Sequence, residues 1–355
     1  MSMRKKYRTA LEEQFPEEIR IIIGGSERRY RKKMSLRYGE NPHQPAAFYS
    51  PAEGPLTVGD MKLLKTGKSG LSMTNVEDMD NAMRIVGYFQ EPACAVMKHV
   101  NPSGAATRNK PGEPLREIYR KARDCDALAA YGSVVGFNTV VDAGTAEEIM
   151  SSYVEAVVAP GYDLGCMEFF EQKKDIRVIQ VTGLDRISRW VGDPPEPLDI
   201  SVQMDGSLVL QAPILTKVRG PGDLRWVTKR QGTAQEAKDL LFSWYVCMNV
   251  RSNGVVLSKD GATIGIGTGQ QDRVTAVKLA LEKAEMRGHK EAVPGSVLAS
   301  DGFFPFRDSV DLLAEHGVAA CVQPGGSVQD KEVIEACDEA GIAMAFTDER
   351  CFRHF

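Results

Sequence analysis

The sequence predicts an α/β protein, and the pattern of its two halves is the main reason. In each half of the 355-residue chain, segments with helical periodicity alternate with short apolar segments that are typical of buried strands. Such alternation is typical of domains in which helices cover a sheet. Turn-forming Pro and Gly residues gather at 185–232, between the halves. We therefore predict two similar α/β subdomains, at 36–190 and 191–355.

The first half contains a helix–strand series and one polar loop. We predict a helix at 75–89, a strand at 93–97, a helix at 114–125, a strand at 133–137, a helix at 145–152 and strands at 154–158 and 177–181. The strand at 93–97, Ala-Cys-Ala-Val-Met, leads directly into a loop rich in Asn, Pro, Ser and Gly. A loop in this position is a usual place for a functional site.

The second half repeats this style of element. We predict a helix at 233–248, strands at 254–258 and 263–266, a helix at 270–286, a strand at 296–299, a helix at 330–340 and a strand at 342–346. The recurrence is one of α/β units, since no repeat of solenoid length is present.

Residues 1–35 differ in composition from the rest of the chain. They are rich in Arg and Lys, most densely from Arg28 to Lys33, although Glu12, Glu13, Glu17 and Glu18 dilute the charge. We interpret this segment as a basic, solvated helical extension, with contact to nucleic acid or another polyanion as the alternative.

The bulk composition excludes several classes of protein. Hydrophobic residues make up 43% and the net charge is −4, which argues against a disordered chain and against a nucleic-acid binder that works through its overall field. No apolar run approaches the roughly 20 residues of a membrane helix, and the first residues lack the apolar stretch of a signal peptide. The seven cysteines form no C-x-x-C pair, so we expect reduced thiols in a cytoplasmic protein.

The segment Lys98-His-Val-Asn-Pro-Ser-Gly104 is the strongest candidate for chemistry. It places an ammonium, an imidazole and an amide together where a strand ends. Such a set can bind an anion and move a proton, because the imidazole of histidine exchanges protons near neutral pH. The alternative is a histidine that caps a loop beside a surface lysine.

A second segment contains three glycines, Gly265, Gly267 and Gly269, ahead of a predicted helix. Glycine allows close backbone approach and a helix N-terminus attracts anions, so the segment resembles a phosphate cradle. It is neither a dinucleotide fingerprint nor a P-loop, because the full G-x-G-x-x-G spacing and a following Lys-Ser or Lys-Thr pair are absent. A tight β-turn is the alternative.

Two further segments combine aromatic and charged residues. Ser300–Asp308 holds three Phe around one Pro, either as core or as a wall that stacks a flat heterocycle beside Asp301, Arg307 and Asp308. The last six residues read Arg-Cys-Phe-Arg-His-Phe. Their cationic groups either hold a phosphate or belong to a disordered tail.

Four motifs in order resemble the AICAR transformylase family: Leu36-Arg-Tyr-Gly-Glu-Asn-Pro-His-Gln44, Met97-Lys-His-Val-Asn-Pro-Ser-Gly104, Ser252-Asn-Gly to Gln-Gln-Asp-Arg273, and Ser300-Asp-Gly-Phe-Phe-Pro-Phe-Arg-Asp308. The resemblance runs from about residue 36 to 354 and leaves residues 1–35 without a counterpart. It implies two tandem cytidine-deaminase-like α/β/α subdomains and a homodimer with sites at the subunit interface. The implied activity is transfer of the formyl group of 10-formyltetrahydrofolate to the amine of aminoimidazole carboxamide ribonucleotide (AICAR), which gives FAICAR in purine (IMP) biosynthesis.

The resemblance also assigns site residues. Lys98 and His99 carry catalysis and Asn101 supports their loop. Nucleotide binding is implied for Arg37, Tyr38, Gly132, Glu155, Asn253, Arg273, Phe303, Arg350 and His354. The folate side is implied for Tyr131, Val274, Pro305 and Phe306, and Asp301 lies near a potassium site of some members. From the chemistry we expect His99 to move a proton, Lys98 to stabilise charge, and Arg37 and Arg350 to clamp the phosphate.

The chain differs from the family in places, and other functions are open to it. Arg353 stands where family members often have a second His. We expect that the chain lacks the cyclohydrolase domain and that a separate IMP cyclohydrolase acts in the same cell. A zinc deaminase would need an H-x-E motif together with a P-C-x-x-C motif, and P-C-x-x-C is absent. A formyl ligase that uses ATP and formate, and an inactive nucleotide sensor or regulator, are the remaining alternatives.

Overall fold

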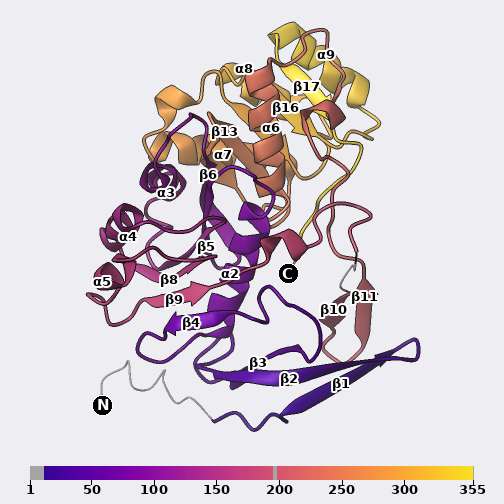
Figure 1. The fold of residues 1–355 in the computed structure, drawn as a ribbon. Coiled ribbons are helices and arrows are strands. Elements are labelled where there is room, and N and C mark those ends of the chain that lie inside the picture. The colour runs from indigo at the N-terminus through magenta and orange to yellow at the C-terminus, as the bar shows by residue number, and fades with distance from the viewer. Residues whose placement is uncertain (1–11, 195–197, 355) are drawn as a thin grey trace. The chain divides into compact units, whose positions relative to one another are not determined.

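The computed structural model describes residues 12–194 and 198–354, and the chain divides into two compact units, up to Ile187 and from Ser188. Each unit has its own α/β core, so the predicted α/β class is confirmed (Figure 1). The N-terminal segment belongs to the first unit.

The first unit is built around a mixed sheet. Its elements are β4 Lys62–Lys65, α2 Met73–Val86, β5 Ala93–Lys98, β6 Asn101–Thr107, α3 Leu115–Asp124, β7 Ser133–Phe137, α4 Ala143–Met150, β8 Val154–Ala159, α5 Cys166–Phe170 and β9 Arg177–Gln180. The strands lie in the order β6-β5-β7-β8-β9-β4. β7, β8 and β9 are parallel, while β5 runs antiparallel to both β6 and β7, and β4 antiparallel to β9.

The second unit repeats this arrangement. Its elements are β12 Arg225–Trp226, α6 Ala234–Cys247, β13 Val255–Lys259, β14 Ala262–Gly267, α7 Arg273–Met286, β15 Val297–Ser300, α8 Asp308–Glu315, β16 Ala320–Gln323, α9 Asp330–Ala340 and β17 Ala343–Phe346. Strand order within the unit is β14-β13-β15-β16-β17-β12. β15, β16 and β17 are parallel, and the other pairs are antiparallel, as at the equivalent places of the first unit. The same strand order and strand directions therefore recur in the two units.

The helix N-termini recur as well. Ser72 caps α2 and Thr233 caps α6, each in a reciprocal capping box with the residue three positions later. Such boxes satisfy two backbone N–H groups that a helix start leaves without a partner. Both helices thus begin at a residue fixed by local sequence.

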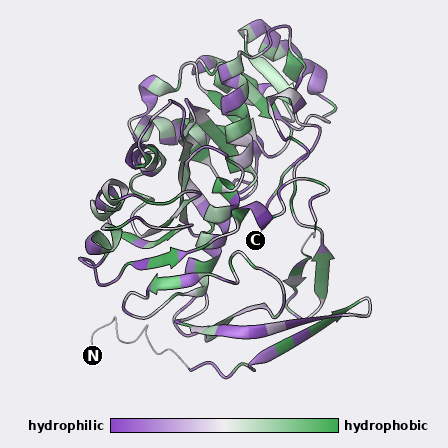
Figure 2. Ribbon diagram, in the orientation of Figure 1, coloured by the Kyte–Doolittle hydropathy of each residue, from purple (hydrophilic) through white to green (hydrophobic). Residues whose placement is uncertain are grey.

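In the first unit, α2 and α3 cover opposite faces of the sheet. A Cβ on Gly136 would lie 2.6 Å from the Cβ of Ala82 on α2, and one on Gly104 would lie 2.0 Å from the carbonyl oxygen of Ala122 on α3. Gly136 pairs with Ala95 and Gly104 with Val96, and these neighbours on β5 point to opposite faces. Figure 1 shows α3, α4 and α5 in a row on one side, and Figure 2 shows mostly apolar strands beneath helices of mixed hydropathy.

Two of the three glycines of the proposed phosphate cradle have a packing role. Gly265 and Gly267 lie inside β14 and are buried. A Cβ on either would come within about 2 Å of a backbone carbonyl of α7, at Ala280 and Ala276 respectively. Close helix–strand packing therefore requires glycine here, whereas Gly269, with φ +67°, lies in a turn.

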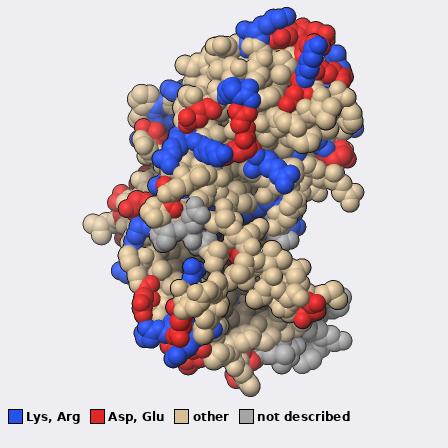
Figure 3. Space-filling model, turned by 90° about the vertical axis from the view of Figure 1, so that its right-hand side faces the viewer, with Lys and Arg blue, Asp and Glu red and all other residues tan. Residues whose placement is uncertain are grey.

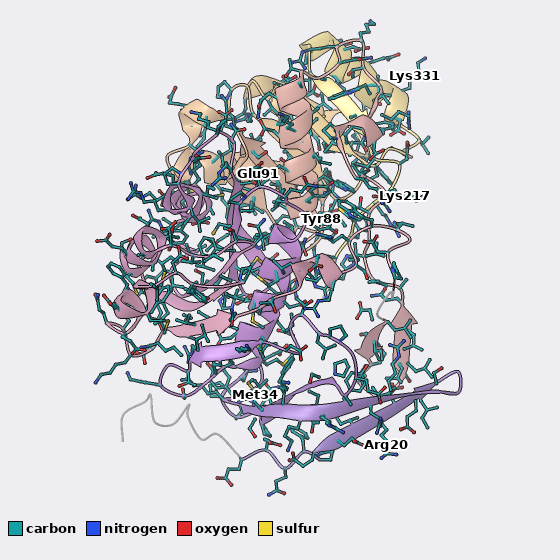
Figure 4. All side chains as sticks on the ribbon, viewed as in Figure 1. Arg20, Met34, Tyr88, Glu91, Lys217 and Lys331 are labelled. Atoms are coloured by element: carbon teal, nitrogen blue, oxygen red, sulfur yellow. The ribbon has the colours of Figure 1, made fainter. Side chains whose placement is uncertain are left out.

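The prediction of a helical extension at 1–35 is wrong for its described part. Glu18–Ile23 forms β1 and Ser26–Leu36 forms β2, and these pair with β3 Ala46–Pro51 in an antiparallel sheet. Alternating side chains such as Ile19, Ile21 and Ile23 are the signal that the basic composition obscured. Arg20 projects from β1 in Figure 4 and pairs with Glu18. Residues 1–11 lie outside the described part.

Several further elements were not predicted, among them β10 Asp199–Val202 and β11 Leu208–Gln211, which form an antiparallel pair, and α5, α8 and β16. They are short, so periodicity has few residues on which to act. No helix in the described part of the chain has the length and apolar character needed to cross a bilayer. All seven cysteines are buried, and acidic and basic side chains are mixed over the face in Figure 3.

Candidate functional site

The candidate catalytic residues of the first unit gather at one end of its sheet. β5 runs antiparallel to β7, with Met97 opposite Val134, so Lys98 at the end of β5 lies beside the start of β7. β8 starts at the same end because it is parallel to β7, and it carries Glu155. The polar groups are therefore held on strand ends.

Lys98 is fixed by a backbone carbonyl of the neighbouring connection. Its Nζ donates to the carbonyl oxygen of Tyr131 over 2.6 Å. Gly132 has a φ of +77°, which favours glycine, and its N–H donates to the Tyr153 carbonyl over 2.8 Å. The Tyr131 ring is 63% exposed and lies 5.1 Å from the Tyr153 ring.

His99 lies in a tight hairpin, so the prediction of a loop after residue 97 is wrong. Lys98 pairs with Asn101 across β5 and β6, and the two-residue turn between them is His99-Val100. Both turn residues have positive φ, 56° and 62°. Two-residue hairpins of this type favour Asn-Gly or Asp-Gly, and positive φ is rare for a β-branched residue. The His99 side chain is exposed, and the Asn101 amide donates to the His99 carbonyl over 3.3 Å.

Helix α2 supplies two residues that the sequence analysis missed. The carboxylate of Asp78 accepts the Val100 N–H over 2.7 Å and also the His99 N–H. Asn75 donates to Glu155 over 3.0 Å. Burial raises the pKa of Asp78 to about 6, although the two amides oppose that shift. The sequence offered one signal for Asp78. It is a carboxylate one helix turn after Asn75 and 20 residues before Lys98.

Arg37 and Tyr38 are positioned just ahead of α2. The Arg37 N–H donates to the Leu71 carbonyl, and the Met73 N–H donates to the Tyr38 carbonyl. The guanidinium carbon of Arg37 lies 5.0 Å from the centre of the Tyr38 ring, a cation–π distance. Both residues are therefore tied to the start of the helix that carries Asn75 and Asp78.

The candidate residues of the second unit centre on a buried ion pair. Arg273 Nη1 lies 2.6 Å from Asp301 Oδ1, and both side chains are almost fully buried. Arg273 also donates to Asn253 Oδ1 over 2.6 Å and to the Gly254 carbonyl over 3.1 Å. The Gly254 N–H donates to Asp301 Oδ2. Removal of either charge would leave the other buried without a counter-ion.

A pocket opens beside this ion pair. Four of its lining residues were predicted from the resemblance, Asn253, Arg273, Phe303 and Pro305. Gln271, Asp272 and Phe352 also line it, and they lie inside quoted motifs although no role was assigned to them. Asp272 additionally caps α7, where it accepts the Thr275 N–H over 2.8 Å.

Residues 351–353 of the C-terminal tail are joined to the rest of the second unit by backbone hydrogen bonds. The Cys351 N–H donates to the Asp301 carbonyl, and the Arg353 carbonyl accepts the Ser252 N–H. Arg350 lies over the Phe352 ring at 4.9 Å, and the rings of Phe352 and His354 are 5.9 Å apart. Arg350 and His354 are exposed and lie outside the pocket lining, as do Val274 and Phe306.

The chain is similar in sequence to a known protein family. A family model described as "AICARFT/IMPCHase bienzyme" matches residues 2–283. The chain belongs to the AICARFT/IMPCHase bienzyme family. The match begins at residue 2, so the expectation that residues 1–35 have no counterpart in the family is wrong.

Relatives of this AICARFT/IMPCHase chain are named bifunctional purine biosynthesis protein PurH. The protein of Roseobacter denitrificans is 43% identical over 328 residues, which cover 90% of this chain and 60% of that protein. The protein of Persephonella marina is 41% identical over 347 residues, 97% of this chain and 62% of its own. The protein of Sorangium cellulosum is 44% identical over 326 residues, 90% and 58%. The chain thus spans about 60% of the length of these relatives.

Across residues 12–194 and 198–354, no three His, Cys, Asp or Glu side chains gather in a way that could hold an ion. Asp301, the residue associated with potassium, has its charge balanced by Arg273. A carboxylate that is already paired with a guanidinium has little charge left for a monovalent cation, so we derive no step through potassium.

Proposed function

We propose that this chain transfers the formyl group of 10-formyltetrahydrofolate to the amine of AICAR, giving FAICAR in purine biosynthesis. Lys98 at the end of β5 and His99 in the turn that follows carry the proposal. His99 has an exposed imidazole, and the preceding residue, Lys98, has an ammonium held by a backbone carbonyl, in a chain of the AICARFT/IMPCHase family. These are the groups that formyl transfer to a weakly nucleophilic amine requires.

In the proposed mechanism His99 moves the proton. The amine nitrogen of AICAR attacks the formyl carbon, its proton passes to the His99 imidazole, and a tetrahedral oxyanion forms. The ammonium of Lys98 stabilises that oxyanion. The bond from the formyl carbon to N10 of the folate then breaks, and N10 takes the proton back from His99. Atoms balance, with tetrahydrofolate and the formylated amine as products.

The remaining predicted residues are proposed to bind the two substrates. Arg37 and Arg350 are proposed phosphate clamps, because a guanidinium can donate two parallel hydrogen bonds to phosphate oxygens. Tyr38, Gly132, Glu155, Asn253, Arg273, Phe303 and His354 are proposed for the nucleotide, and Tyr131, Val274, Pro305 and Phe306 for the folate. The exposed aromatic rings of Tyr131, Phe303 and Phe306 suit flat heterocycles.

The deciding experiment is an assay of the purified chain with AICAR and 10-formyltetrahydrofolate. It follows tetrahydrofolate formation and identifies nucleotides by mass. Folate-dependent FAICAR formation would support the proposal. FAICAR and IMP are scored separately, so the assay also tests the expectation that this chain does not close the ring.

Two control experiments address the alternative functions. ATP plus formate replaces the folate in the first, and product there alone would favour a formyl ligase. Calorimetric titration with AICAR forms the second, and binding without turnover would favour a nucleotide sensor. The proposed homodimer is tested by light scattering, and the potassium expectation by exchange of potassium for sodium.

A further inference from the structure

Asp78 on α2 forms hydrogen bonds with the turn that contains His99. The carboxylate of this residue on α2 accepts the backbone N–H groups of both turn residues, His99 and Val100. Asp78 is only 6% exposed. A buried acceptor that satisfies two neighbouring amides fixes the turn relative to the helix.

The second unit contains the same device at the equivalent place. Asp239 on α6 accepts the N–H of Asp260 over 3.1 Å and that of Gly261 over 2.8 Å. These two residues form the turn between β13 and β14, and both have positive φ, 53° and 71°. The lysine before the turn, Lys259, donates to the Pro294 carbonyl over 2.7 Å, as Lys98 does to Tyr131. The carboxylate precedes its lysine by the same number of residues in both units.

The two turns differ in the residues they contain. Asp260-Gly261 is the kind of pair that such hairpins favour, since Gly adopts positive φ at no steric cost. His99-Val100 is not, because Val at a φ of 62° is an outlier for a β-branched residue. Residues held in unfavourable backbone conformations persist where the surrounding structure over-determines them, and they gather at functional sites.

We infer that Asp78 is a positioning residue for His99, holding both turn amides so that the imidazole stays in place on a backbone that His and Val disfavour. The inference rests on the proposed role of His99 in formyl transfer. Asp239 performs the same anchoring where no catalytic group is carried. The Asp260-Gly261 turn of the second unit is thus a matched control for the His99-Val100 turn.

The test compares Asp78→Asn with Asp239→Asn. Each change keeps the shape and removes the charged acceptor, and a displaced catalytic group costs up to about 100-fold in rate. We expect Asp78→Asn to lower kcat about 10- to 100-fold with little change in KM for AICAR, and Asp239→Asn to leave kcat within about 2-fold. Equal losses in both variants would show a general folding effect and overturn the inference.

Two further variants separate positioning from stability. Val100→Gly places at this positive φ a residue that adopts it without steric cost. The double variant Asp78→Asn/Val100→Gly should therefore recover part of the kcat that Asp78→Asn loses. In a His99→Ala background, Asp78→Asn should lower kcat no further, because it acts through the absent imidazole. Multiplied losses in the double variant would overturn the inference, as would Asp78→Asn turnover within about 2-fold of the parent.

Hydrogen exchange keeps this inference separate from the proposed function. Asp78→Asn should speed amide exchange in the 93–107 hairpin, and Asp239→Asn should do so in 255–267. If the parent chain forms no FAICAR, the proposed function fails while the anchoring is still measured. Unchanged exchange in 93–107 would overturn the anchoring itself, whatever the activity.

Discussion

Asp78 and Asp239 occupy the same position in the two units, each accepting both central amides of the hairpin turn that follows its helix. The surrounding elements recur in the same order and with the same strand directions. What distinguishes the first unit is the content of its turn, where His99 and Val100 replace an Asp-Gly pair. A common structural device thus carries a candidate catalytic group in one unit.

His99→Ala should lower turnover by about 100-fold or more, because a positioned general base contributes about that factor. Asp260→Ala is the matched control, since it also places Ala at positive φ in the equivalent turn. We expect the control to keep parental kcat while both variants melt at similar temperatures. Near-normal turnover in His99→Ala would remove this residue from the proposed mechanism.

Arg350→Ala should raise KM for AICAR about 10- to 100-fold with kcat nearly unchanged, as expected when a charged hydrogen bond made in the ground state is lost. Arg225→Ala is the control, because its guanidinium also lies over a Phe ring and pairs with exposed Asp348. Steady-state kinetics measure kcat and KM for AICAR in both variants. A fall in kcat at unchanged KM would contradict the phosphate-binding role of Arg350.

Gly267→Ala should lower the free energy of unfolding by about 1–3 kcal/mol or more, because the new Cβ would meet the Ala276 carbonyl oxygen at 2.0 Å. Gly220→Ala is the control, since nothing lies within 4 Å of its Cβ position. Its effect should stay within about 0.5 kcal/mol. Denaturant titration measures both, and equal stability of the two variants would disprove the packing role.

The stability of the protein should depend on the ionisation of Asp78. Glu77 on the same helix, Glu155 on β8 and Lys98 on β5 are the charged groups around it. Its pKa is raised to about 6, against 3.8 for the unperturbed group, so the folded state favours the neutral acid. That contribution is fully present below pH 4 and is lost as the pH rises through about 6.

The measurement compares the parent with Asp78→Asn between pH 4 and pH 7. The stability of the parent relative to the variant should fall by up to about 3 kcal/mol over this range. Urea titrations at matched pH values give the difference directly. A difference that does not change with pH, or that rises with pH, would contradict the raised pKa.

Local signals predicted some regular elements with their observed bounds and missed others. The strand at 133–137 and the helix at 330–340 have the predicted bounds. The sheet of β1, β2 and β3 was not predicted, because the many basic side chains of 1–35 obscure the alternation of its isoleucines. Short elements such as β16 carry too few residues for periodicity to mark them.

The sequence by itself determined the α/β class, the recurrence of two units, the family, and the residues Lys98 and His99 as candidates for chemistry. These follow from periodicity and from motifs, which are properties of neighbours along the chain. Tertiary structure decided that 98–101 is a hairpin, that Gly265 and Gly267 serve packing, and that Asp78 supports His99. The glycine packing and the Asp78 contact join groups that are well separated along the chain, and such a contact also holds the hairpin on a backbone that His and Val disfavour. One-dimensional patterns do not encode contacts of this kind.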